Sequence, residues 1–214
     1  MRLLAISDLH LGSPANWEHF AGIGASPEDW LILAGDVAET DEQLSLAFDH
    51  LRSRFARVIW GPGNHELWSL DRSPGVARGE ARYQALIALA RSFGVVTPED
   101  PYPVWPGCDR LVHIAPLFLL YDYTFRPDVV SADQVLAWAA QEEIVCVDEY
   151  LLDPYPHSGR AAWCLVRVAA TRLAALPDEC TTVLINHFPL RRAHAHLPRA
   201  PRFSPWCGTR ATDD

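Results

Sequence analysis

Six polar side chains of the kinds that bind metals or move protons follow short apolar runs of this 214-residue sequence. In chain order these side chains are Asp8, His10, Asp36, Asn64, His65 and His187. The apolar runs are residues 2–7, 30–35, 56–60 and 181–186, and each has the length and composition of a buried strand. Because open α/β sheets bind their ligands at the carboxyl ends of the strands, we expect these side chains to meet at one sheet edge.

Each of these residues has an ordinary structural explanation when it is taken alone. An aspartate after a strand is commonly a turn residue or a helix N-cap, and an asparagine after glycine is commonly a turn residue. The same pattern nevertheless recurs at every one of these strand ends. Gly35 and Gly63 directly precede Asp36 and Asn64, and glycine permits a close approach of the backbone at such positions. The repetition favours one shared site.

The donor types indicate which chemistry such a site would perform. Carboxylates, imidazoles and an amide, without thiolates, suit manganese, iron or zinc. Asp8 and His10, two residues apart on an extended chain, are expected to point to the same face, and the two oxygens of Asp36 can bridge two ions. Two ions about 3.5–4 Å apart would hold a bridging hydroxide and clamp a phosphoryl group. His65, beside a ligand, is placed to protonate the leaving oxygen.

The motifs D-x-H at 8–10, G-D at 35–36 and G-N-H-E at 63–66, followed by the strand-terminal His187, resemble the calcineurin-like metallophosphoesterases. The resemblance covers nearly the whole chain. It implies a four-layer α/β/β/α sandwich with a dinuclear metal site. It also implies residue roles: Asp8 and His10 on the first metal, Asp36 as the bridge, Asn64 and His187 on the second metal, and His65 at the leaving group.

One family motif does not appear in the sequence. The family completes its site with G-H-x-H on a further strand, one histidine for each metal. Here His194 and His196 have the internal spacing, but Ala193 replaces the glycine and no apolar run precedes them. We therefore expect both histidines to be loop residues and the C-terminal strands of the sandwich to be missing from this chain. The missing ligands would lie beyond residue 214, come from another subunit, or be truly lost.

The remaining elements follow from hydrophobic periodicity. Helical spacing covers residues 42–55, 78–93, 131–143 and 159–176, and a further apolar run at 110–115 predicts another strand. The proline-rich segments 97–107 and 151–159 are expected to be loops. Strands that alternate with helices indicate an α/β fold. We expect residues 1–214 to form a single domain, with a loop elaboration over the site at 117–157.

Composition excludes several classes of function. All 18 basic residues are arginine, so lysine-dependent Schiff-base and Walker-loop chemistry is absent. The net charge of −9 opposes an extended nucleic-acid surface. No apolar stretch approaches the length that spans a membrane, and the five scattered cysteines lack C-x-x-C spacing. A cytoplasmic protein is the expectation, and the sequence does not define an oligomeric state.

These observations predict a metal-dependent phosphoesterase that hydrolyses a small phosphomonoester or phosphodiester with a metal-bridging hydroxide. Its cofactors would be two divalent ions, manganese foremost, with iron or zinc as alternatives. The alternative function is a non-hydrolytic or degenerate member of the fold that acts as a binding module or catalyses another reaction in a biosynthetic pathway. The missing G-H-x-H favours that alternative, whereas His65 opposes it, because a binding module has no need of a leaving-group acid.

Overall fold

The computed structural model describes residues 1–152 and 159–213, the side chains of 159–165 excepted. Its first sheet is parallel, with the order β1 (Leu3–Ile6), β2 (Ser26–Ala34) and β3 (Phe55–Gly61). In its second sheet, β4 (Val112–Pro116) pairs in parallel with β5 (Thr181–Ile185). All five predicted strands are therefore confirmed.

The two sheets pack face to face because alternate residues of each strand point to opposite sides. One side of the first sheet meets the second sheet in an apolar cluster made of Trp30, Ile32, Ile59, Val112, Ile114 and Ile185. The intervening residues, Leu31, Leu33, Val58 and Trp60, point the other way into the larger core. Each buried Leu, Ile or Val side chain of this kind stabilises the fold by about 1.5–3 kcal/mol relative to leaving it exposed.

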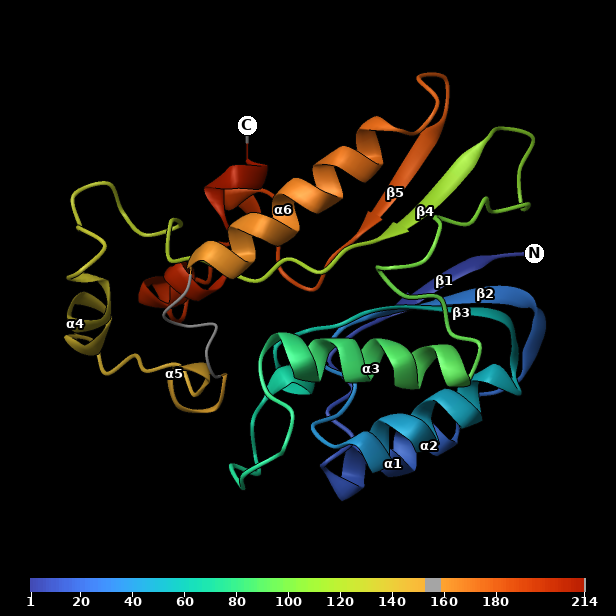
Figure 1. Cartoon of the computed structure of the whole chain (residues 1–214), viewed down its shortest axis with the longest axis horizontal. Coiled ribbons are helices and arrows are strands. Elements are labelled where there is room, and N and C mark those ends of the chain that lie inside the picture. The colour runs from blue at the N-terminus through green and yellow to red at the C-terminus, as the bar shows by residue number, and fades with distance from the viewer. Residues whose placement is uncertain (153–158, 214) are drawn as a thin grey trace.

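Helices cover the outer faces of both sheets (Figure 1). The larger core joins the first sheet to α1 (Pro14–Ala21), α2 (Asp41–Arg52) and α3 (Glu80–Ser92). On the far side, α6 (Gly159–Ala174) runs along the second sheet, and its Val166 and Leu173 line a cavity together with Leu184 of β5. The order of layers is helix, sheet, sheet, helix, so the predicted four-layer sandwich is confirmed.

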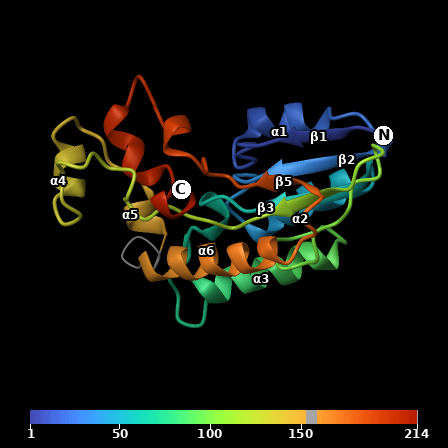
Figure 2. The ribbon, with the colours of Figure 1, turned by 90° about the horizontal axis from the view of Figure 1, so that it is seen from above.

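The described part of the segment between β4 and α6, residues 117–152, lies beyond the carboxyl ends of the strands and carries α4 (Val135–Ala140) and α5 (Asp148–Leu151). Two perpendicular views agree that it sits at one end of the molecule, beside the C-terminal 3-10 helices (Figures 1 and 2). The loop elaboration predicted at 117–157 stays a prediction, and residues 153–157 of it, with most of the proline-rich segment 151–159, lie outside the described residues. No strand follows β5 in the described part of the chain.

Several helix boundaries differ from the sequence prediction. The helix predicted at 131–143 is shorter, because residues 131–134 form a turn and Glu143, at φ 58°, turns the chain after α4. Helix α2 ends at Arg52 because Phe55 already begins β3. The sequence analysis missed α1, whose one buried residue is Phe20, so that it lacks a clear apolar stripe.

The larger core draws residues from Leu11 to Trp206, and we accordingly propose that the whole chain is one domain. Every helix among the described residues is too short or too polar to cross a membrane.

Candidate metal centre

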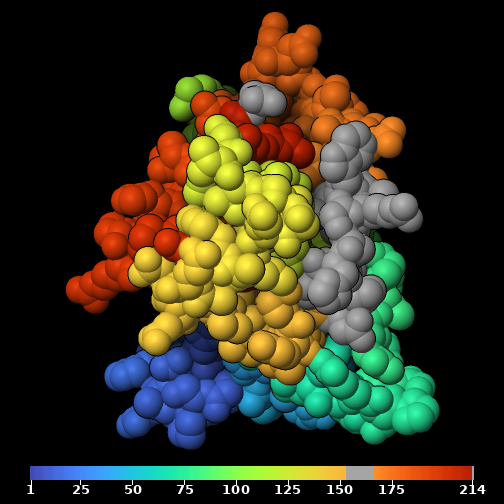
Figure 3. All heavy atoms as spheres, turned by 90° about the vertical axis from the view of Figure 1, so that its left-hand side faces the viewer, coloured from blue at the N-terminus to red at the C-terminus, as the bar shows by residue number. Residues whose placement is uncertain are grey.

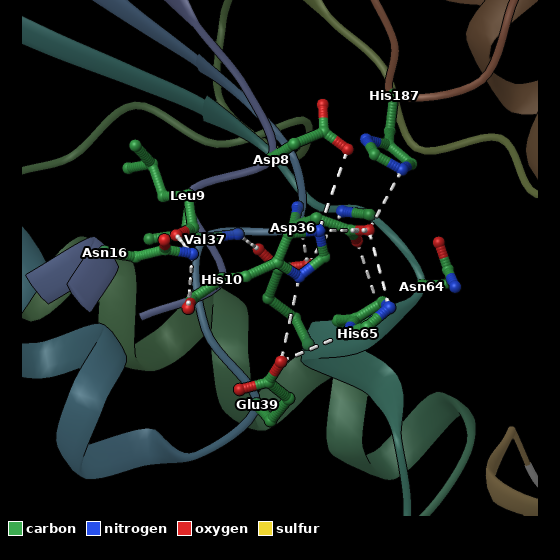
Figure 4. Close-up of polar contacts among 12 residues, drawn as sticks. Asp8, Leu9, His10, Asn16, Asp36, Val37, Glu39, Asn64, His65 and His187 are labelled. Carbon is green, nitrogen blue, oxygen red and sulfur yellow. Dashed lines mark hydrogen bonds and ion pairs between the residues drawn. The ribbon is translucent and has the colours of Figure 1, made fainter. Parts of the chain in front are cut away.

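The loops that follow β1, β2, β3 and β5 bring the predicted site residues to the same end of the two sheets, as Figure 4 shows for Asp8, His10, Asp36, Asn64, His65 and His187. Asp36 lies in the middle of this group and is buried, with 4% of its surface exposed. The six side chains that follow the strand ends in the sequence therefore lie near one another in the structure.

The backbone at these positions is not extended, which corrects the expectation for Asp8 and His10. Their φ angles are 56° and 43°, and that of Asp36 is 53°, all in the left-handed region. The two loops are held together by hydrogen bonds from Asp8 N to the Gly35 carbonyl and from His10 N to the Asp36 carbonyl. Non-glycine residues in this region cost about 1–3 kcal/mol each, and such strained residues tend to cluster at functional sites. The side chains converge because the loops turn sharply.

Asp36 Oδ2 is the centre of the cluster. The Nε2 atoms of three histidines surround it, 3.3 Å away for His187, 3.7 Å for His65 and 3.9 Å for His10. Ligand atoms of His10, Asp36 and His65 lie within 4.8 Å of one another, and so do those of Asp8, Asp36 and His187. Both groups share Asp36, as a bridging residue would. The family resemblance pairs Asp8 with His10 on the first metal. In the structure, His10 instead groups with His65, and Asp8 groups with His187.

His187 is oriented by the backbone so that one ring nitrogen is directed at Asp36. Its Nδ1 lies 3.0 Å from the Ala34 carbonyl oxygen, which can only accept, so Nδ1 carries the proton and Nε2 faces Asp36. Burial lowers the pKa of His187, but the hydrogen bond and charge of Asp36 outweigh burial and raise it to about 9. Burial likewise opposes the ionised form of Asp36, yet His187 and His65 hold the pKa of that carboxyl below its usual value. The cluster thus keeps Asp36 ionised.

Asn64 is oriented by a residue far away in the sequence. Its Nδ2 donates a hydrogen bond to Asp148 Oδ1 at 2.9 Å, across 84 positions of chain. Its Oδ1 accepts no hydrogen bond among the described residues. The carbonyl oxygen, which is the atom that a metal would take, is therefore left free.

Two glutamates support the cluster, and the sequence analysis missed the first of them. Glu39 Oε1 lies 3.1 Å from Nδ1 of His65; the carboxylate accepts, so the proton sits on Nδ1 and Nε2 is directed at Asp36. The position of Glu39, three residues after Asp36, was the available signal. Glu66, the last residue of the G-N-H-E motif, accepts hydrogen bonds from the backbone N–H groups of Gly63, Asp36 and Val37. Glu66 thereby ties the loop after β2 to the loop after β3.

His65 is fixed on a further side by Trp68. The two rings are 3.6 Å apart between centroids and tilted by 31°, and the Trp68 indole N–H donates to Asp148. A cavity of about 300 Å³ lies next to this arrangement and includes Glu39, Trp68 and Leu70 in its lining. This volume is at the lower end of the range for small-ligand sites.

The donor set fits divalent metal ions. Carboxylate oxygens, imidazole nitrogens and one free amide oxygen are the ligands that such ions take in mixed oxygen and nitrogen sites. Asp36 Oδ2 and His10 Nε2 are 3.9 Å apart, beyond ordinary hydrogen-bond length, as expected for two groups that share an ion. The second nitrogen of His187 has a partner outside the cluster, as is usual for metal-binding histidines.

His194 and His196 are exposed, and neither joins a group of potential metal ligands in the described part of the chain. His194 ends a 3-10 helix that begins at Arg192. That these two histidines are loop residues stays a prediction, and the histidine controls in the Discussion test it.

Gly63→Ala is expected to abolish metal binding and to destabilise the protein by about 1–3 kcal/mol, the usual range for overpacking. A Cβ at position 63 would lie 2.1 Å from Asp36 Oδ1 and 2.7 Å from Asp36 N, so the central carboxylate would have to move. Chemical denaturation and metal analysis measure the two effects. Gly24→Ala is the matched control, because a Cβ there meets nothing within 4 Å. Equal metal binding by the Gly63 and Gly24 variants would contradict the close approach.

A sandwich of this order, with acids and imidazoles gathered at its strand ends, defines the class of metal-dependent phosphoesterases. A family model for calcineurin-like phosphoesterases matches residues 1–209. The chain belongs to the calcineurin-like phosphoesterase family.

Two comparisons with individual proteins agree. The chain is 48% identical over 216 residues to the acyl-carrier-protein phosphodiesterase PptH of Mycobacterium tuberculosis, an alignment that covers 99% of this chain and 67% of the relative. It is also similar to the crystal structure of the phosphopantetheinyl hydrolase PptH from Mycobacterium tuberculosis. The TM-score is 0.91 and the sequence identity 46%, over 100% of this chain and 77% of the solved one.

These findings confirm the predicted enzyme class. The protein is a metal-dependent phosphoesterase, a hydrolase whose family uses divalent metal ions. The alternative of a non-hydrolytic binding module is not supported, because the similarity to a phosphodiesterase extends over nearly the whole chain.

Proposed function

We propose that this protein is a phosphodiesterase that releases a phosphopantetheinyl group from an acyl-carrier protein. The observation that carries the proposal is the 48% identity to PptH over 99% of this chain. That similarity extends over every strand and loop that places the cluster around Asp36. The substrate would be a small phosphorylated group attached to a protein, a more specific form of the small phosphoester predicted from the sequence.

The proposed residue roles are those that the family resemblance implies, and the gathering of these side chains around Asp36 supports them. Asp8, His10, Asp36, Asn64 and His187 would hold two divalent ions, with Asp36 common to both. Such ions, when bound, supply a nucleophile near neutral pH and neutralise charge on the phosphoryl group. Manganese is the proposed metal at both positions, because oxygen and imidazole donors suit it. Iron or zinc would fit the same donors.

His65 would donate a proton to the leaving oxygen. Its Nδ1 is bound to Glu39 and its Nε2 faces the cluster, so the proton to be transferred would come from Nε2. Glu39 would stabilise the protonated ring and keep it from rotating. A Cβ at position 12 would lie 2.5 Å from Glu39 Oε2, so glycine at that position leaves room for the carboxylate.

We also propose a cytoplasmic location. The supporting observation is that the described cysteines, Cys108, Cys146, Cys180 and Cys207, are all free thiols, as is usual in a reducing compartment.

The test uses acyl-carrier protein that carries a phosphopantetheinyl group, incubated with the metal-free protein to which manganese is added back. Intact mass is expected to fall by one phosphopantetheinyl group, with free phosphopantetheine in solution. Parallel samples with iron, zinc or magnesium test the choice of metal. If the carrier is unchanged while bis(p-nitrophenyl) phosphate is hydrolysed, the protein is a phosphoesterase with a different substrate.

A further inference from the structure

Asp148 is a buried carboxylate that lacks a positively charged partner among the described residues. It is 1% exposed, and no arginine or histidine of the described chain forms an ion pair with it. A buried charge of this kind is tolerated only when hydrogen bonds satisfy its oxygens. Three side chains do so: Asn64 Nδ2 at 2.9 Å and Trp68 Nε1 at 2.6 Å on Oδ1, and Tyr121 OH at 3.1 Å on Oδ2.

Two of these three donors belong to the loop after β3 that contributes to the site. Asn64 is a proposed metal ligand, and Trp68 packs against the ring of His65 at 3.6 Å between centroids. Asp148 itself comes from the start of α5, in the segment between β4 and α6. Figure 3 looks onto this end of the molecule, where the yellow and orange residues of that segment occupy the middle of the face, above the blue N-terminal residues and the teal residues that follow β3.

Glu149, the next residue of α5, anchors the segment away from the loop after β3. Glu149 Oε1 accepts hydrogen bonds from Tyr123 OH and Trp206 Nε1, each at 2.7 Å. Both donors lie outside the loop after β3. Adjacent carboxylates therefore do different things: Glu149 fastens the segment to the C-terminal region, whereas Asp148 contacts the site.

We propose that Asp148 is a positioning residue that holds the Asn64 side chain with its carbonyl oxygen directed to the metal centre. The two ends of an amide differ chemically, so an acceptor that binds Nδ2 decides where Oδ1 points. Without Asp148, the Asn64 amide is free to rotate and present Nδ2, which cannot bind a metal. This inference rests on the proposed metal centre and adds to it a residue from the segment over the site.

The experiment measures manganese binding to the metal-free protein by isothermal titration calorimetry, without reference to activity. Asp148→Ala is expected to weaken one of the two binding events by about 10–100-fold, the usual effect of removing a partner of a metal ligand. Asp148→Asn is expected to restore most of the affinity, because its Oδ1 can still accept from Asn64 and Trp68. If the asparagine variant binds as weakly as the alanine variant, charge and not orientation is responsible, and the proposal is wrong.

Glu149→Ala is the matched control for loosening of the segment. Both alanine variants are expected to lower the melting temperature of the metal-free protein, but Glu149→Ala should leave manganese affinity within about twofold, as for an independent site. Equal loss of affinity in the two variants would show a merely structural role. Asp148→Leu, which fills similar space without an acceptor, replaces the alanine variant if that one does not fold.

A double-mutant cycle with Asn64→Ala tests whether Asp148 acts through Asn64. In the Asn64→Ala background, Asp148→Ala is expected to cause no further loss of affinity, and an additive loss would overturn the proposal. Wild-type protein that binds no manganese would instead refute the metal centre itself, which distinguishes the two failures.

Discussion

Replacing Asp36 with asparagine is expected to abolish binding of both metal ions and all measurable hydrolysis. Three histidine Nε2 atoms approach Asp36 Oδ2, from 3.3 to 3.9 Å, and both groups of potential ligands among the described residues include Asp36. An amide has no negative charge and only one acceptor oxygen. Removing a hydrogen-bond partner of a metal ligand already lowers metal affinity by about 10–100-fold. Removing a carboxylate that is shared by two ions should therefore lower it further. Elemental analysis and turnover of bis(p-nitrophenyl) phosphate measure the two losses.

The fold should survive this substitution. The hydrogen bond from His65 N to Asp36 Oδ1, 3.1 Å long, can be kept by the asparagine carbonyl oxygen. Asp29→Asn provides the matched control, since Asp29 is a similarly buried carboxylate that binds Arg2 outside the site. That control should retain both ions. Two ions bound to Asp36→Asn would reject the bridging role.

Replacing His65 with alanine is expected to leave both ions bound and to slow turnover of alkyl phosphodiesters by about 10²–10⁴-fold, the usual contribution of general acid–base catalysis. The leaving alkoxide of such an ester is strongly basic and needs the proton that His65 Nε2 would donate. A p-nitrophenyl leaving group is weakly basic and needs little protonation, so turnover of p-nitrophenyl esters should slow much less. Steady-state kinetics on both kinds of ester, with metal analysis of the same samples, measure the contrast.

Two outcomes would contradict the proton-donor role. If turnover of both kinds of ester slowed equally, the proton-donor role would lose its support. If the variant lost an ion, His65 would be a metal ligand instead. The structure makes the second outcome a sharp test, because His65 Nε2 lies only 3.7 Å from Asp36 Oδ2. His194→Ala and His196→Ala are the histidine controls, and neither should change metal content or either rate.

The strands and the convergence of the candidate ligands could be predicted because both depend on local patterns. A buried strand leaves a short apolar run, and the polar residues after such runs lie at the carboxyl edge of a parallel sheet whatever the loops do. Asp36 and His187 are predicted in this way, from local patterns alone. Helix ends were less predictable: α2 stops at Arg52 because β3 begins at Phe55, a competition that helical periodicity does not record.

The sequence by itself determined the sandwich, the family and the set of polar residues at the strand ends. Only the tertiary structure decided how these residues are held. Asp8 and His10 adopt left-handed backbone angles because the loops after β1 and β2 hydrogen-bond to each other. Asp148 reaches Asn64 because the segment after β4 folds back over the strand ends, across 84 positions of chain. Periodicity reports which face of an element is buried, whereas contacts between distant loops depend on how those elements pack, and no local pattern contains that information.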